Sequence, residues 1–362
     1  MCYNHLFYLI SSIFILSERT QSQDSRGPGV SSCCFYGFRN KADCGLSEVL
    51  ITDTPKECTS MIYSAVNIDL NHKVSDHVSA DNFKTLDKML KSGKRMIVYY
   101  GRNNQAEWSS MLACESSNGG ANSKDEMKGL KEFLDEHPKI AGIIIYGLQY
   151  DTSSSEFPTY SENFKVYLDV MRSTFPELII GIDIFGIILI DQYNDPKFKW
   201  LDIKVIDPAV DFYAVTLEYF NDCSPDFRNT GTTPMNGSNT SHTLEILRDV
   251  LTKLSFPKEK TYFKFSTGPS TMKESDNLCT ANFELMCKDP KIATDWCADT
   301  QLSFNEKGRY SEKYGAGFMA NYVDFDDPDN CCNCEYPYPA FHALLDGFNL
   351  VSTKTCDSLI RH

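Results

Sequence analysis

Several apolar segments of the sequence end in side chains that could bind a ligand or move a proton. In a parallel barrel, residues that follow the strands gather at one face of the molecule. Carboxylates at such a face act as general acids and bases, whereas aromatic rings, amides and guanidinium groups bind sugars. The segments end in Tyr99-Tyr100-Gly101-Arg102, Leu148-Gln149-Tyr150-Asp151, Leu217-Glu218-Tyr219-Phe220 and Asp324-Phe325-Asp326-Asp327.

The elements that must position these residues follow a regular order. Strand-like segments rich in Ile, Val, Tyr and Phe alternate with amphipathic helix-like segments. The strand-like segments are almost continuously apolar, as strands buried on both faces are. The strands are expected at 33–38, 61–68, 95–100, 140–150, 178–185, 211–219, 261–266 and 315–325, and the helices at 81–92, 124–137, 161–175, 243–254 and 339–348. The pattern predicts an α/β protein with a single closed (β/α)8 TIM barrel.

One stretch, at about 270–312, interrupts this rhythm. It contains Cys279, Cys287 and Cys297 and has no long periodic run. We therefore expect a short cysteine-containing insertion between strands 7 and 8, within one barrel domain that spans 23–362.

The first residues have the features of a signal peptide. The apolar run Leu6–Leu16 is too short to span a bilayer, and the small residues Thr20 and Ser22 precede a possible cut before Gln23. We expect residues 1–22 to be removed and the mature protein to be secreted. No later segment has about 18 consecutive apolar residues, so no membrane anchor is expected.

The cysteines and the sequons fit an extracellular protein. The chain has 14 cysteines, and removal of Cys2 with the signal peptide leaves 14 − 1 = 13. In an oxidising compartment this count predicts several disulfides and an odd thiol. The sequons at Asn236 and Asn239 lie in a polar stretch and predict surface N-glycosylation.

Composition and charge exclude other classes of protein. A hydrophobic content of 42% supports a large core, and a net charge of −14 argues against nucleic acid and anionic membranes as partners. The cluster Cys331-Cys332-Asn333-Cys334 could bind a metal, but disulfides are favoured in a secreted chain. The acidic segment 324–329 lacks the glycine and final Glu of an EF-hand, so we expect no metal and no cofactor.

Several stretches, over about residues 30–350, resemble the family 18 glycoside hydrolases, which comprise chitinases and chitinase-like lectins. These stretches are Cys34-Phe35-Tyr36 with 57–65, similar to the first two strands; Gly142, similar to the glycine of a DGxDxDxE strand; 211–219, similar to the sixth strand; 317–327 with Cys331 and Cys332, similar to the eighth; and 338–344, similar to the last helix. The resemblance implies disulfides of Cys34 with Cys58 and of Cys287 with Cys331 or Cys332. Cys114 and Cys223 both follow strands at one face, so we also consider a bond between them.

The sequence departs from this family at the catalytic strand. The resemblance implies hydrolysis by a protonated Glu, with aspartates earlier on the same strand raising its pKa. With Gly142 fixed, the acidic positions are occupied by Ala141, Ile144, Tyr146 and Leu148, and a slip of one residue would place Gln149 at the acid's position. None of these side chains has a carboxyl group, so we expect no chitinase activity.

Other family positions are changed as well. Glu218 and Tyr219 occupy the Tyr and Asp places of the Met-x-Tyr-Asp segment, Asn321 replaces the eighth-strand Trp, and Tyr100-Gly101-Arg102 replaces Gly-Gly-Trp. These residues could still bind sugar. The carbohydrate-binding candidates are Tyr100, Arg102, Tyr146, Gln149, Glu218, Tyr219 and Asn321.

Two further interpretations of the same residues involve no sugar. Ile144, Tyr146 and Leu148 could simply fill the barrel, and Arg102 could form an ion pair with Glu218 that plugs the old cleft.

Together these observations predict a secreted, non-catalytic chitinase-like protein. Its ligand would be chitin, an N-acetylglucosamine-containing glycan or an extracellular protein. The alternatives are a hydrolase with a relocated acid, Glu218 or Asp151, and a secreted scaffold that binds protein and no sugar.

Overall fold

The computed structural model describes residues 26–35, 53–76, 83–102, 105–113, 115–148, 159–194, 201–218, 220–237, 242–272, 282–288, 291 and 294–359. Eight parallel strands close into a barrel, because β1 pairs with both β11 and β2. In barrel order they are β1 (Ser31–Phe35), β2 (Ser60–Ile68), β4 (Arg95–Gly101), β5 (Ile140–Tyr146), β6 (Ile179–Phe185), β7 (Phe212–Thr216), β8 (Thr261–Ser266) and β11 (Gly317–Asn321). The predicted TIM barrel is confirmed.

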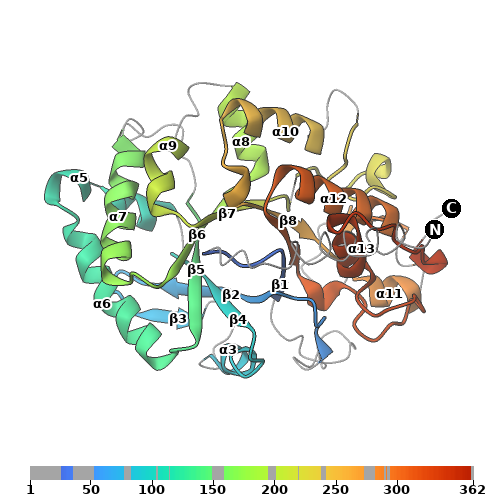
Figure 1. Cartoon of the computed structure of the whole chain (residues 1–362), viewed down its shortest axis with the longest axis horizontal. Helices are drawn as coiled ribbons and strands as arrows, with labels where there is room; N and C mark the ends of the chain where they lie inside the picture. The colour runs from blue at the N-terminus through green and yellow to red at the C-terminus, as the bar shows by residue number, and fades with distance from the viewer. Residues whose placement is uncertain are drawn as a thin grey trace, which may run out of the picture.

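Helices surround the strands, as Figure 1 shows. They are α3 (Lys84–Met89), α4 (Gln105–Leu112), α5 (Glu115–Asn118), α6 (Ala121–Glu136), α7 (Tyr160–Thr174), α8 (Gly186–Asn194), α9 (Ile203–Ile206), α10 (Leu244–Lys253), α11 (Phe283–Lys288), α12 (Gln301–Tyr314) and α13 (Pro339–Phe348). Three short strands lie outside the barrel: β3 (Val74–Asp76), which pairs with β2, and the pair β9 (Ser270–Thr271) and β10 (Trp296–Cys297). In the part of the chain described, no helix is both long and apolar enough to cross a membrane.

The buried side chains form two separate clusters, as the alternation of a strand requires. One cluster fills the barrel interior and includes Ile62, Ile144 and Met319. The other lies between the strands and the helices and includes Val98, Phe164 and Leu344. A residue's position on its strand therefore decides whether it faces the interior, here called the lumen, or the surrounding helices.

Some predicted boundaries are wrong. Residues 301–314 form α12, a helix packed against α13, so the predicted insertion ends before residue 301. β5 ends at Tyr146, because Gly147 adopts φ +72° and breaks the extended backbone. The signal peptide and Asn239 lie outside the described residues, whereas Asn236 is described and exposed.

The same alternation corrects one predicted disulfide. Cys33, not Cys34, bonds to Cys58, with their Cα atoms 5.7 Å apart. Cys33 faces the outer cluster, where Cys58 also lies, whereas Cys34 faces the lumen and is a buried free thiol. Cys223 bonds to Cys297, so the considered bond between Cys114 and Cys223 is wrong.

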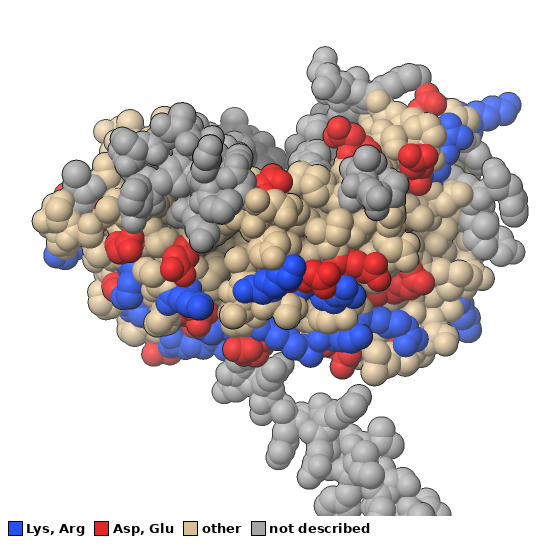
Figure 2. Space-filling model, turned by 90° about the horizontal axis from the view of Figure 1, so that it is seen from above, with Lys and Arg blue, Asp and Glu red and all other residues tan. Residues whose placement is uncertain are grey.

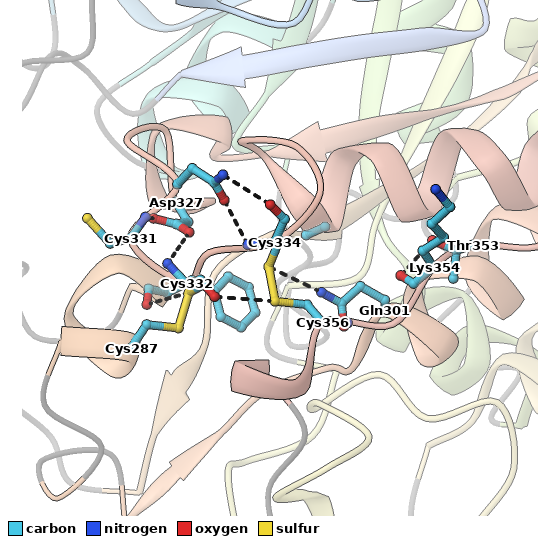
Figure 3. The surroundings of a disulfide bond; sticks show 12 residues. Cys287, Gln301, Asp327, Cys331, Cys332, Cys334, Thr353, Lys354 and Cys356 are labelled. Carbon is cyan, nitrogen blue, oxygen red and sulfur yellow. Dashed lines mark hydrogen bonds between the residues drawn. A yellow bond between two sulfur atoms is a disulfide. The ribbon is translucent and has the colours of Figure 1, made fainter.

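Two more disulfides lie close together near the C-terminus (Figure 3). Cys287 bonds to Cys332, one of the two pairings that the family resemblance implied, and Cys334 bonds to Cys356. Cys331 keeps a free thiol, whose sulfur points away from the neighbouring disulfide in Figure 3.

Substitution of the two adjacent cysteines distinguishes their roles. Cys33→Ser opens a link across a sequence separation of 25 residues and should lower the free energy of unfolding by roughly 2–4 kcal/mol. Cys34→Ser removes no covalent link and should cost about 1 kcal/mol. Urea denaturation of both variants measures the difference. A larger loss for Cys34→Ser would contradict the observed pairing.

Candidate functional site at the barrel mouth

The strand at the family's catalytic position has no carboxylate in the lumen. Ile144 and Tyr146 point into it, and half-buried Ala141 packs against the lower part of the same cluster. Leu148 follows the turn at Gly147 and packs into the outer cluster instead. Leu148, the first of the two positions expected for the acid, therefore does not face the lumen.

Tyr146 is held firmly at the mouth of the lumen. Its ring meets that of Tyr99 edge to face at 5.8 Å, and its hydroxyl donates a hydrogen bond to Asn67 Oδ1. Gly101 makes room for the ring, since a Cβ there would lie 2.6 Å from a Tyr146 ring carbon. Tyr146 thus presents an aromatic ring in a fixed orientation.

Two of the predicted sugar-binding residues face the wrong way. Tyr100 and Arg102 lie outside the lumen, where both contact the buried carboxylate of Glu126 on α6. Tyr167 also donates to Glu126, at 2.7 Å, and the Arg102 guanidinium lies 5.5 Å from the centre of the Trp108 ring. The predicted ion pair of Arg102 with Glu218 is therefore wrong, and this buried cluster joins β4 to the helices.

The lumen instead contains a polar group that the sequence analysis missed. Asp183 on β6 accepts hydrogen bonds from Thr216 and, at 3.4 Å, from Tyr99. Lys264 on β8 is 6% exposed, and its ammonium lies 4.6 Å from the centre of the Tyr99 ring. The sequence did contain a signal for this group. Two otherwise uncharged strands, β6 and β8, each contain one charged residue, Asp183 and Lys264, at a position that faces the lumen.

Glu218 and Asn321 complete the site. Asn321 is 1% exposed and donates to Glu218 Oε2 at 3.2 Å. Glu218 is half-buried just beyond the end of β7, and the Asn321 Oδ1 atom is buried without a hydrogen-bond partner. These two predicted residues come together, whereas Gln149 and Tyr219 lie outside the described residues.

Burial and charge set the protonation of these groups. Burial raises the pKa of Asp183 and of Glu218, and the nearby Lys264 ammonium only partly opposes this. Burial disfavours the charged form of Lys264, but the neighbouring Tyr99, Asp183 and Glu218 outweigh it and raise its pKa. Lys264 therefore stays an ammonium, and burial raises the pKa of the nearby Cys34 thiol to about 12.

Within the described residues, no group of side chains has the makeup of a metal site. In the acidic segment considered for calcium, Asp326 accepts from the amides of Ala340 and Phe341 at the start of α13. Asp327 accepts from the amides of Cys331 and Cys332 (Figure 3). These two carboxylates thus serve to fix the backbone.

The outer surface shown in Figure 2 carries both acidic and basic side chains. On the face shown in Figure 2, acidic and basic side chains alternate and form no large patch of one sign.

Comparison with known proteins identifies the fold. No family model matches the sequence, and no curated protein matches it. Solved structures do match. The Ostrinia furnacalis Group IV chitinase superimposes with a TM-score of 0.68 at 14% identity, over 89% of this chain and 100% of that chain. The chain has the chitinase fold.

Catalytic and non-catalytic proteins share this chitinase fold. Human YKL-39, described as a pseudo-chitinase with retained chitooligosaccharide binding, matches with a TM-score of 0.66 at 12% identity, over 89% of this chain and 100% of that chain. The immunomodulatory active chitinase TsES1 of Trichuris suis matches with a TM-score of 0.66 at 12% identity, over 88% and 100%. The fold alone therefore does not decide between binding and hydrolysis.

The contribution to stability of the buried polar cluster around Glu126, which lies outside the lumen, can be tested by substitution. Arg102→Met leaves a buried carboxylate without its cation and should lower the free energy of unfolding by about 3–5 kcal/mol. Lys165→Met removes an exposed partner of Asp169 on α7 and should cost less than about 1 kcal/mol. Urea denaturation compares the two. Equal small losses would contradict the structural role of the Arg102–Glu126 pair.

Proposed function

We propose that this protein is a secreted, non-catalytic chitinase-like protein that binds chitooligosaccharides at the barrel mouth. The observation that carries the proposal is the β5 strand, where Ile144 and Tyr146 occupy lumen positions and Leu148 faces the outer cluster. A carboxyl general acid accounts for orders of magnitude in rate, and this strand offers none. Membership of family 18 is part of the same proposal.

Binding is supported by the groups that remain at the mouth. The ring of Tyr146 is held in place, and sugars stack on aromatic faces. Glu218 is half-buried and can receive hydrogen bonds from a ligand, and the buried Asn321 holds its carboxylate in place. A chitooligosaccharide offers both the hydroxyl groups and the amide groups that such a site needs.

Secretion is supported by the disulfides. Four connect distant segments within the described residues, and such bonds persist in oxidising compartments. The signal peptide over residues 1–22 and glycosylation at Asn236 and Asn239 belong to this proposal.

One observation favours a second candidate, a hydrolase with a relocated acid. Burial raises the pKa of the half-buried Glu218, so it holds its proton to a higher pH, as a general acid must. Asp183 supplies a second carboxylate in the same lumen. Release of dye from a fluorogenic chitooligosaccharide, abolished by Glu218→Gln, would establish this candidate and overturn the non-catalytic proposal.

Restoring the missing acid alone should not restore hydrolysis. Leu148→Glu places a carboxyl group in the apolar outer cluster, where it faces no sugar, and Ile144 and Tyr146 remain unchanged. We expect no turnover of the fluorogenic substrate at any pH between mildly acidic and neutral. Measurable turnover would show that the position does face the substrate.

The binding surface can be tested with Tyr146. Tyr146→Ala removes the stacking ring and should weaken binding of an N-acetylglucosamine oligomer by about two- to tenfold, since such stacking contributes roughly 0.5–1.5 kcal/mol. Tyr193→Ala, an exposed tyrosine at the end of α8 on the outer side, serves as the matched control. Isothermal titration calorimetry measures both. Equal affinities of the two variants would place the sugar elsewhere.

A further inference from the structure

A cavity of about 220 Å³ lies outside the barrel, at the last two helices. Its walls are Gln301 at the start of α12, the segment 334–336, one face of α13 and the tail segment 352–356. None of the described residues that line this C-terminal cavity belongs to a barrel strand. A ligand bound here would therefore be separate from the sugar proposed for the mouth.

Covalent and hydrogen bonds fix the walls of the C-terminal cavity. The Cys334–Cys356 disulfide joins the segment before α13 to the tail segment, and Figure 3 shows Gln301 beside it. Gln301 is 3% exposed, and its Oε1 accepts from the amide of Cys356 at 3.3 Å. The cavity is thus formed before a ligand arrives, which lowers the cost of binding.

The two acids that line the cavity differ in their partners. Glu335 Oε1 lies 2.5 Å from the ammonium of Lys354. Asp346 on α13 is half-buried, and among the described residues it has no cation within ion-pair distance. His342, one turn earlier on the same face, does not supply one, because burial lowers its pKa. Two negative charges against one positive charge leave one carboxylate without compensation.

An exposed aromatic ring lies beside that carboxylate. Tyr336 is 53% exposed, and its ring lies 5.3 Å from that of His342, one helical turn from Asp346. Tyr193, the other exposed tyrosine in the described part of the chain, has the Lys253 ammonium 4.7 Å from its ring centre. No described lysine or arginine lies over the ring of Tyr336 in this way. The ring and the carboxylate together therefore offer a site for a cation from outside the chain.

The rim of the cavity is apolar. Leu350 and Val351 directly precede the tail segment, and Leu302 directly follows Gln301. These side chains are 48%, 53% and 57% exposed, and with Tyr336 they make up four of the seven exposed large apolar side chains among the described residues. Such a concentration of exposed apolar groups is typical of a surface that contacts another protein.

We propose that the C-terminal cavity binds an arginine side chain of a partner protein, presented by a segment with apolar residues on either side of it. The planar guanidinium can stack on the Tyr336 ring and donate two parallel hydrogen bonds to the Asp346 carboxylate. The flanking apolar residues would cover Leu302, Leu350 and Val351. A sugar could use the ring and the carboxylate but would leave this apolar rim in water, so the rim favours a protein segment.

The test uses two synthetic peptides with capped ends, Gly-Leu-Arg-Leu-Gly and Gly-Leu-Gln-Leu-Gly. Surface plasmon resonance measures the binding of each to the full chain at low ionic strength. The wild-type protein should bind the arginine peptide about tenfold more tightly than the glutamine peptide, since the ring and the carboxylate both attract the cation. Salt at about 1 M should reduce the difference, because it screens the charge pair.

Two substitutions in the cavity and two matched controls locate the binding. Asp346→Asn removes the charge, and Tyr336→Leu removes the ring but keeps an apolar side chain. Each should weaken binding of the arginine peptide by about three- to tenfold and leave the glutamine peptide unchanged. Asp191→Asn and Tyr193→Leu make the same changes at exposed positions of α8, outside the cavity, and should behave as the wild type does.

Three outcomes would overturn the proposal. Equal affinity of the wild-type protein for the two peptides would show that the arginine is not recognised. Equal losses in the cavity and the α8 variants would place the peptide elsewhere. Binding of an N-acetylglucosamine tetramer that Tyr336→Leu abolishes, with no binding of the arginine peptide, would make the cavity a sugar site. None of these outcomes tests Tyr146 at the barrel mouth, so the proposed function stands or falls by its own experiment.

Discussion

The ammonium of Lys264 constrains the whole centre of the barrel. A charge taken out of water costs several kcal/mol unless other groups compensate it. Here Asp183 on β6 and Glu218 just beyond the end of β7 lie near the ammonium without forming an ion pair with it, so their charges stabilise it at a distance. Each carboxylate is in turn held by neighbours, Asp183 by Thr216 and Glu218 by Asn321. Residues from several strands must therefore keep their positions together, and a change at one alters the protonation of the others.

This constraint also describes how the lumen differs from the one that the family resemblance implied. Negative charge has not disappeared from it, because Asp183 remains on β6, the strand next to the apolar β5, and Glu218 remains just beyond the end of β7. What is absent on β5 is a carboxyl group aimed at the mouth, since Ile144 and Tyr146 fill those positions. The family resemblance implied acids that raise one another's pKa on a single strand. In this chain the carboxylates come from different parts of the barrel, Asp183 on β6 and Glu218 just beyond β7, and they share their environment with a lysine.

The sequence predicted the fold well, because long apolar runs separated by amphipathic segments leave few other architectures. It predicted the site only in part, because the choice between lumen and outer face changes with every residue. Tyr99 and Tyr100 are chemically alike, yet the first faces the lumen and the second contacts Glu126. Cys33 and Cys34 are identical, and the wrong one was expected to form the disulfide. Neither composition nor a distant resemblance fixes this register. The lone charges in the β6 and β8 segments were visible in the sequence, but only the closed barrel shows that they lie near each other in the lumen.

The mouth of the barrel is also prepared for a ligand in advance. Tyr146 packs against Tyr99 and the backbone at Gly101, and its hydroxyl is already bound to Asn67, so little rotamer freedom is left for a ligand to remove. Ordering a free side chain on binding costs roughly 0.5–1.5 kcal/mol. A rigid ring beside a buried polar group therefore supports the proposed binding of a sugar, since both parts are in place before a ligand arrives. Turnover would have a different requirement, a proton donor that changes state during the reaction.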